Sequence, residues 1–127
     1  MRVLGIDPGL RSTGWGVVSI SQGRLRHIAN GAIRPNPRQS DASRLTMIYK
    51  GLSSVIADTK PDCAAIEDIF VAKSVRSALR LGMARGVGIF ACGEAQIEVR
   101  EITPRAVKKA VVGTGTASKE QIQDMVA

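Results

Sequence analysis

Two acidic residues of this chain each stand at the end of a short apolar run. Asp7 follows the run 3–6 and is itself followed at once by Pro8-Gly9. The run predicts a buried strand and Pro-Gly ends it, so Asp7 stands at the rim of a sheet. A carboxylate in such a place is costly to desolvate unless a cation, an arginine or several hydrogen-bond donors compensate it. The alternative is that Asp7 caps its own turn, and taken alone the two interpretations are equally good.

The second acid, Glu67, ends the apolar run 62–66 and is followed by Asp68. If the two strands are neighbours in one sheet, the carboxylates of Asp7 and Glu67 converge on one edge. Their mutual repulsion then calls for a proton or a metal ion. Oxygen ligands of this kind suit Mg²⁺, with Mn²⁺ as the alternative. Asp68 points to the other face if the strand persists. The simpler interpretation is that Glu67 and Asp68 only begin a polar turn.

The elements that must position these acids follow from hydrophobic periodicity and from cap residues. Ser40 or Asp41 caps the first predicted helix, and Ser74 caps the second. The predicted order is strand 3–7, connection 8–13, strand 14–20, strand 24–33, loop 34–38, helix 42–57, strand 62–67, helix 75–92, strand 97–100, helix 104–112 and a helix that begins at 118. This order predicts a single α/β domain over residues 1–127, in which an antiparallel three-strand meander joins parallel strands.

Composition places the chain among globular proteins with a polyanionic partner. A net charge of +7 over 127 residues favours nucleic acid first and an anionic membrane second. No apolar run approaches the roughly 20 residues of a membrane span, and the N-terminus reads as a strand rather than a signal peptide. Cys63 and Cys92 lack metal-ligand spacing, which predicts reduced core thiols in a cytosolic protein. The single histidine, His27, is interpreted as a surface or packing residue.

Two basic groups are candidates for nucleic-acid contacts. The first consists of Lys73, Arg76 and Arg80, on one side of the second helix with no acid between them. Like charges at helical spacing destabilise a helix slightly, so an external anion is expected there. The second group consists of Arg105, Lys108, Lys109 and Lys119. A solvated surface face is the common alternative for both groups.

Three glycines, Gly82, Gly86 and Gly88, are unusual inside a soluble helix, because each costs about 1 kcal/mol relative to alanine. Close approach of another backbone would explain them, and packing against the protein's own sheet is the alternative. Phe70, three residues after Glu67, is interpreted from the sequence alone as a core residue.

Longer stretches of the chain resemble the RuvC family of crossover junction endodeoxyribonucleases. They are Gly5-Ile6-Asp7-Pro8-Gly9 with residues 12–18, then 65–73, 77–82, 84–87, 107–115 and 117–119, in the order of that family. The resemblance implies a ribonuclease-H-like mixed sheet flanked by helices and a homodimer. It also implies metal-dependent cutting of Holliday junctions in recombination and DNA repair, with a branch-migration helicase complex as a further partner.

By this resemblance Asp7 and Glu67 are two of the family's metal-binding catalytic carboxylates, and the complete site holds two Mg²⁺ ions. The family places its remaining acids in a helix beyond Ala127, so the chain is expected to be C-terminally incomplete. Glu120 and Asp124 do not align with those acids and are interpreted as surface residues.

The same resemblance assigns roles in DNA binding and dimerisation. Lys108, Lys109 and Lys119 match basic residues that lie near the site and contact DNA. Phe70 matches a residue that wedges or stacks against bases at the junction. The helix that carries the three glycines matches the dimer interface, where Gly82 and Gly86 would admit a symmetric contact.

Two other functions compete with junction cleavage. One is a non-cleaving form that still binds junctions or dimerises, which the missing acids favour. The other, more remote, is a phosphotransferase of the actin-like ATPase fold, whose first phosphate loop also begins with Asp-x-Gly on a hairpin. The lack of a second such loop and the match around Glu67 argue against it.

Overall fold

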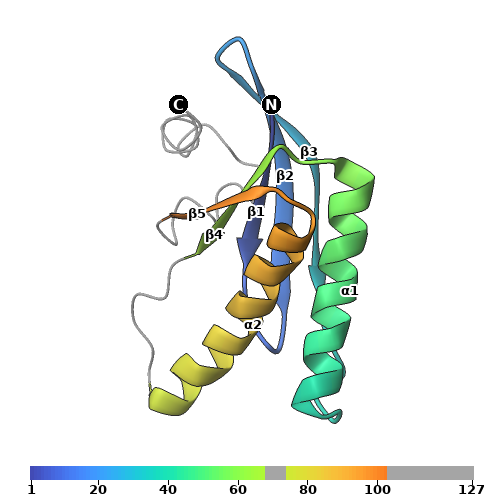
Figure 1. Ribbon diagram of the computed structural model, residues 1–127, viewed down its shortest axis with the longest axis vertical. Helices are drawn as coiled ribbons and strands as arrows, with labels where there is room; N and C mark the ends of the chain where they lie inside the picture. Colours follow the sequence, from blue (N-terminus) through green and yellow to red (C-terminus); the bar gives the residue numbers. More distant parts are fainter. Residues whose placement is uncertain (68–73, 103–127) are drawn as a thin grey trace.

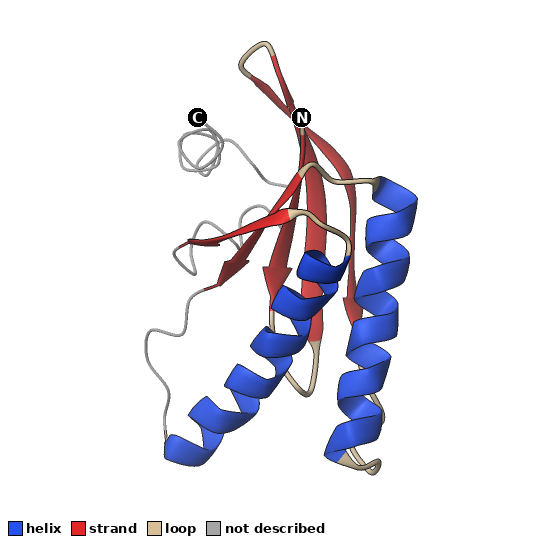
Figure 2. Cartoon of the chain, viewed as in Figure 1, coloured by secondary structure: helices blue, strands red, loops and turns tan. Residues whose placement is uncertain are grey.

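The computed structural model describes residues 1–67 and 74–102, which form a five-stranded mixed sheet with two helices (Figures 1 and 2). The elements are β1 (Arg2–Asp7), β2 (Thr13–Ser21), β3 (Arg24–Ile33), α1 (Asp41–Thr59), β4 (Cys63–Glu67), α2 (Val75–Glu94) and β5 (Glu98–Ile102). The sheet order is β3-β2-β1-β4-β5. β1, β2 and β3 pair antiparallel, whereas β4 pairs parallel with both β1 and β5. The predicted meander joined to parallel strands is therefore confirmed.

Both helices pack on the same face of the sheet (Figure 2). The core on that face consists of Leu4, Ile6, Leu10, Val17, Ala64 and Ile66 from the sheet and its first loop, Ile48, Leu52 and Ile56 from α1, and Ala84, Ala91 and Cys92 from α2. A smaller buried cluster contains Val3, Val18, Cys63 and Ala65. Because side chains alternate along a strand, this second cluster belongs to the sheet face that points away from α1 and α2.

α1 begins where the cap residues predicted and ends slightly later. The Ser40 hydroxyl accepts a hydrogen bond from the Ser43 N–H at 3.2 Å, so Ser40 is the N-cap. The periodicity predicted an end at Ala57, but the helix continues to Thr59, whose hydroxyl donates to the Val55 carbonyl at 2.7 Å. Lys60 then turns left-handed, with φ of 48°, and its N–H closes the last turn on Ile56.

α2 is capped by Ser74, whose hydroxyl accepts from the Ser77 N–H at 3.1 Å, as predicted. The helix extends to Glu94 rather than Cys92, and β5 begins at Glu98 rather than at residue 97. The predicted helices at 104–112 and from 118 lie outside the described residues.

Cys63 and Cys92 are free, buried cysteines, as predicted. Burial raises the pKa of the Cys63 thiol and raises the pKa of Cys92 to about 11. A thiol that keeps its proton at neutral pH is a poor nucleophile and a poor metal ligand, so both cysteines serve the core.

His27 is exposed on β3, and its Nε2 lies 3.2 Å from Oδ1 of Asn30, in keeping with a surface role. Within the described ranges, neither helix is long and apolar enough to cross a membrane.

Gly88 brings α2 close to β1 and β4, because a Cβ there would lie 3.2 Å from Cδ1 of Ile66. Gly93, in the last turn of the same helix, has open space around it. We expect Gly88→Val to lower the free energy of unfolding by about 1–3 kcal/mol through overpacking. The matched Gly93→Val should change it by less than about 0.5 kcal/mol. Denaturant titration measures both, and equal stabilities would contradict the close packing of α2.

Candidate active site

Asp7 and Glu67 are the last residues of two neighbouring parallel strands. Ile6 pairs with Ile66, so the next step of this register sets Asp7 beside Glu67, on backbones about 4.8 Å apart. A Cβ at Gly88 would lie 3.2 Å from Ile66 and 3.7 Å from Ile6, so both isoleucines face α2. Asp7 and Glu67, one residue later, therefore point to the opposite face of the sheet. The structure brings the two predicted acids together at one edge.

This pair of carboxylates fits a Mg²⁺ ion that keeps part of its water shell. Mg²⁺ takes six oxygen ligands and is commonly held by one or two carboxylates together with water. Asp7 and Glu67 are both half-buried, so solvent reaches them. Over residues 1–67 and 74–102, no group of three or more His, Cys, Asp or Glu gathers that could enclose a metal. The described acids thus suffice for one hydrated ion.

The loop Pro8–Ser12, which continues from Asp7, is held in a closed conformation. The hydroxyl of the fully buried Thr13 donates to the Gly9 carbonyl at 2.7 Å and accepts from the Gly9 N–H at 3.2 Å. A Cβ on Gly9 would lie 2.5 Å from the Ser12 carbonyl oxygen, so only glycine fits. β2 begins at Thr13 rather than Gly14, and sequence reasoning assigned Thr13 to the loop without a role.

Two arginines of the helices contact these strand ends. Arg44 of α1 is 7% exposed, and its Nη2 donates to the Leu10 carbonyl at 3.3 Å. Arg85 of α2 donates from Nε to the Glu67 carbonyl at 3.3 Å, and its Nη2 bonds the carboxylate of Glu101 on β5.

Sequence reasoning singled out neither arginine, although one signal was available. The buried stripe of α1 contains Ile48, Leu52 and Ile56 at steps of four, and one further step back reaches Arg44. Charged residues are rarely buried at core positions of an amphipathic helix, so Arg44 could have been identified as a candidate for a specific role. Arg85 lies beside the buried stripe of α2 and carries no comparable signal.

The predicted basic group around the start of α2 is only partly described. α2 begins at Val75, so Lys73 precedes it. Arg76 is exposed, and no carboxylate of the described chain lies within ion-pair distance of it. Arg80 lies 3.5 Å from Asp41 of α1, an acid that spacing along α2 could not indicate. The predicted DNA contacts outside the described residues are Phe70, Lys73, Lys108, Lys109 and Lys119.

Gly82, Gly86 and Gly88, the three glycines of α2 that the sequence analysis considers, differ in surroundings. Gly88 packs against the protein's own sheet, whereas Gly86 is exposed with open space around it and Gly82 is half-buried. The large apolar residues Val75, Leu79 and Phe90 are 79%, 66% and 61% exposed. Positions 75, 79, 82, 86 and 90 recur at steps of three and four, so they form one outward face. We call these five residues the α2 stripe.

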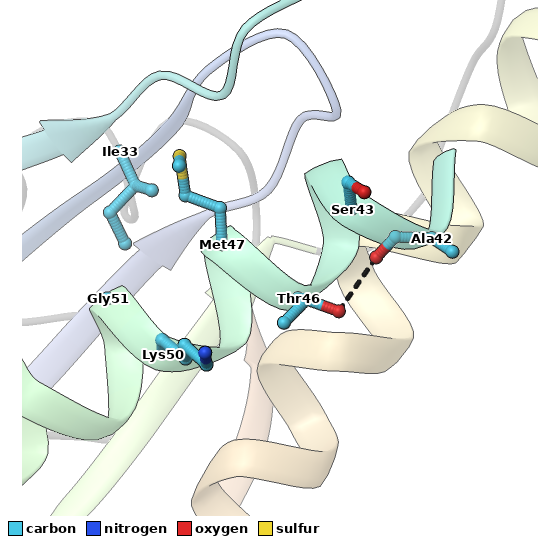
Figure 3. Close-up of a pocket in the computed structure, with 7 residues that line it drawn as sticks. All are labelled: Ile33, Ala42, Ser43, Thr46, Met47, Lys50 and Gly51. Carbon is cyan, nitrogen blue, oxygen red and sulfur yellow. Dashed lines mark hydrogen bonds between the residues drawn. The ribbon is translucent and has the colours of Figure 1, made fainter. Parts of the chain in front are cut away.

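A groove of about 660 Å³ lies between β3 and α1 (Figure 3). It is lined by Ile33, Ala42, Ser43, Thr46, Met47, Lys50 and Gly51. This lining is largely apolar and contains no carboxylate, so the groove is not part of the candidate metal site.

Residues 3–127 match the model of the family described as crossover junction endodeoxyribonuclease RuvC. The chain belongs to the RuvC family. The RuvC of Zymomonas mobilis is 47% identical over 127 residues, which cover all of this chain and 76% of that protein. The RuvC of Trichlorobacter lovleyi is 51% identical over 126 residues, 99% of this chain and 71% of that protein.

Solved RuvC structures share the fold. The structure of Thermus thermophilus RuvC in complex with Holliday junction substrate superposes with a TM-score of 0.77 and 28% identity, over 86% of this chain and 68% of that one. The yeast mitochondrial Holliday junction resolvase Ydc2 superposes with a TM-score of 0.61 at 12% identity, over 81% and 50% of the two chains, and shows the fold alone. The predicted ribonuclease-H-like fold is confirmed.

The hydrogen bonds between Thr13 and Gly9 give a direct test of the closed loop. Thr13→Val keeps the buried volume but leaves the Gly9 N–H and carbonyl without this partner. We expect it to lower the free energy of unfolding by about 1–2 kcal/mol. Thr13→Ser, which keeps the hydroxyl, should cost less. Urea denaturation compares the two, and a Val variant as stable as the parent would show that the hydroxyl does not hold the loop.

Proposed function

We propose that this chain resolves four-way DNA junctions by Mg²⁺-dependent hydrolysis of phosphodiester bonds, with Asp7 and Glu67 as the metal ligands. The observation that carries the proposal is the pair of acids at adjacent ends of β1 and β4, in a member of the RuvC family. The Thermus relative solved with a Holliday junction substrate supports the choice of substrate. Mn²⁺ is the alternative ion, because it accepts the same oxygen ligands.

In this proposal the two carboxylates hold the metal on the sheet face opposite α1 and α2. A Mg²⁺ bound there would supply an activated water and stabilise charge on the leaving oxygen. Asp7 and Glu67 are half-buried at the rim, where a phosphodiester can approach from solvent. The closed loop Pro8–Ser12 keeps the backbone after Asp7 in one position. A second ion, which the family resemblance predicts, would need ligands from outside the described residues.

Neutralising either acid tests this assignment. Asp7→Asn or Glu67→Gln should reduce Mg²⁺-dependent cleavage of a synthetic four-way junction on the order of 100-fold or more, since electrostatic stabilisation of the transition state is lost. Junction binding measured in Ca²⁺ should persist. The matched control is Asp58→Asn, an exposed acid of α1.

Undiminished cleavage by Asp7→Asn would contradict the assignment. Junction binding without cleavage by the unmodified chain would instead favour the non-cleaving alternative.

We further propose that the basic residues bind DNA phosphates. Arg76 and Arg80 are the described members, joined by Lys73, Lys108, Lys109 and Lys119, and Phe70 would stack on or wedge between bases. Two observations support this proposal: Arg76 is exposed with no carboxylate of residues 1–67 and 74–102 within ion-pair distance, and the net charge is +7.

The salt dependence of junction binding tests the phosphate contact. Each phosphate contact releases about one counterion, so Arg76→Gln should flatten the log–log salt slope by about one. Arg24 is an exposed arginine at the start of β3. Arg24→Gln removes the same charge as Arg76→Gln and should leave the salt slope unchanged. Equal slopes for Arg76→Gln and the parent would argue against the contact.

We propose that a second copy of the chain covers the α2 stripe. Monomeric proteins rarely expose large apolar patches, and a two-fold axis would place the stripe against itself. The open space at Gly86 would admit a partner's backbone. At one end of the stripe, the rings of Phe90 and Tyr49 lie 5.7 Å apart, which extends the apolar surface towards α1.

Sedimentation velocity tests this dimer. Leu79→Asp would bury a charge in the interface and should weaken dimerisation by about 2 kcal/mol or more, roughly 30-fold. Met47→Asp, at a 45% exposed apolar site of α1 outside the stripe, should leave the dimer intact. A Leu79→Asp variant that dimerises like the parent would contradict the proposed interface.

A branch-migration helicase complex and a cytoplasmic location are proposed from the family resemblance alone. Neither proposal depends on a described surface of the chain.

A further inference from the structure

We infer that Arg44 and Arg85 are positioning residues of the metal site. Each holds the backbone at or just after one strand end from the helix side, and together they set how far apart Asp7 and Glu67 lie. The inference rests on the proposed metal site and adds the groups that would determine its geometry.

Arg44 is placed where an arginine costs stability. Arg44 is 7% exposed, and its Nε is buried without a hydrogen-bond partner among the described residues. No carboxylate within residues 1–67 and 74–102 lies within ion-pair distance of its guanidinium. It also lies at the start of α1, where the positive end of the helix dipole disfavours a cation. Burial of an unpaired charge does not stabilise a fold, so the position of Arg44 calls for another reason.

The contact of Arg44 supplies that reason. Its Nη2 donates to the carbonyl of Leu10, three residues after Asp7. The Leu10 side chain is 5% exposed in the core, and Thr13 closes the loop on Gly9. The backbone after Asp7 is thus attached at three points. The nearly invariant φ of Pro8 removes one backbone rotation between Leu10 and Asp7, so these attachments restrict the positions that Asp7 can take.

Arg85 makes the equivalent contact at the other strand end. Its Nε donates to the carbonyl of Glu67 itself, and its Nη2 bonds the carboxylate of Glu101. Glu101 lies on β5 opposite Ile66, so Arg85 ties the end of β4 to the neighbouring strand. The Arg85 side chain is 15% exposed and its bond to the Glu67 carbonyl is partly buried, whereas the Glu101 side chain is 55% exposed.

The two arginines therefore form a matched pair. α1 supplies one for the end of β1, and α2 supplies one for the end of β4, both from the face opposite the carboxylates. Residues that orient metal ligands typically change metal affinity by about 10-fold to 100-fold when they are replaced. Direct metal binding is accordingly the readout that separates positioning from general stability.

The experiment is a Mn²⁺ titration of the unliganded protein, followed by loss of the free-Mn²⁺ EPR signal. Arg44→Met and Arg85→Met keep the apolar stem and remove the guanidinium, and each should weaken Mn²⁺ binding about 10-fold. Arg44→Lys, which keeps the charge and a donor, should recover part of the loss. Arg2→Met is the matched control, because Arg2 also donates to a backbone carbonyl, Thr59, at 2.6 Å, but at the start of β1.

Amide hydrogen exchange gives a second readout. The Gly9 N–H donates a hydrogen bond to the Thr13 hydroxyl. Arg44→Met should accelerate hydrogen exchange at this N–H, whereas Arg85→Met and Arg2→Met should not. Circular dichroism and thermal unfolding establish that each variant is folded. If Arg44→Met does not fold, Arg44→Lys and Arg85→Met carry the test.

Asp7→Asn in the same titration separates this inference from the proposal on which it rests. Mn²⁺ binding that survives Asp7→Asn would contradict the metal site itself. Loss of binding in Asp7→Asn, together with parental affinity in folded Arg44→Met and Arg85→Met, would contradict the positioning roles alone. A weakening of the same size in Arg2→Met would also overturn them, because it would reflect general destabilisation.

Discussion

The parallel pairing of β1 with β4 is the interaction on which the candidate site depends. Its register is set at the far end of the strands, where the Asp62 N–H donates to the Arg2 carbonyl at 2.8 Å and the Arg2 N–H donates to the Asp62 carboxylate at 2.7 Å. Both strands are then buried and apolar until their last residues, Asp7 and Glu67. A slip of one residue would turn Glu67 towards the helices and separate the two acids.

One face of the sheet packs against the two helices, and the other face carries the candidate metal site. Parallel neighbours need a crossover, and α1 lies within the connection that leads from the meander to β4. α2 follows β4 and packs closely at Gly88, so both helices cover the same face. The acids emerge on the other face. Groups on the helix face, Arg44 and Arg85 among them, can therefore shape the backbone of the site without lying on the side that the substrate approaches.

The sequence predicted local features well and predicted long-range contacts only through family resemblance. Ser40 and Ser74 were identified as caps because a cap is a bond between near neighbours. The strand ends at Asp7 and Glu67 followed from apolar runs, but their convergence depended on an adjacency that periodicity does not encode. The pairing of Arg80 with Asp41 joins residues 39 positions apart, which no spacing rule along α2 could reveal. The hydrogen bond from Arg44 to the Leu10 carbonyl was not predicted, because it also joins residues that are far apart in the sequence.

The most direct test of the central claim is a crystal structure of the protein grown with Mn²⁺, with data collected at an energy where manganese scatters anomalously. The account predicts an anomalous peak at the ends of β1 and β4, on the face away from α1 and α2, within about 2.0–2.3 Å of a carboxylate oxygen of both Asp7 and Glu67. The peak should disappear in Asp7→Asn. A peak held by other residues, or carboxylates of Asp7 and Glu67 that point to opposite faces, would contradict it.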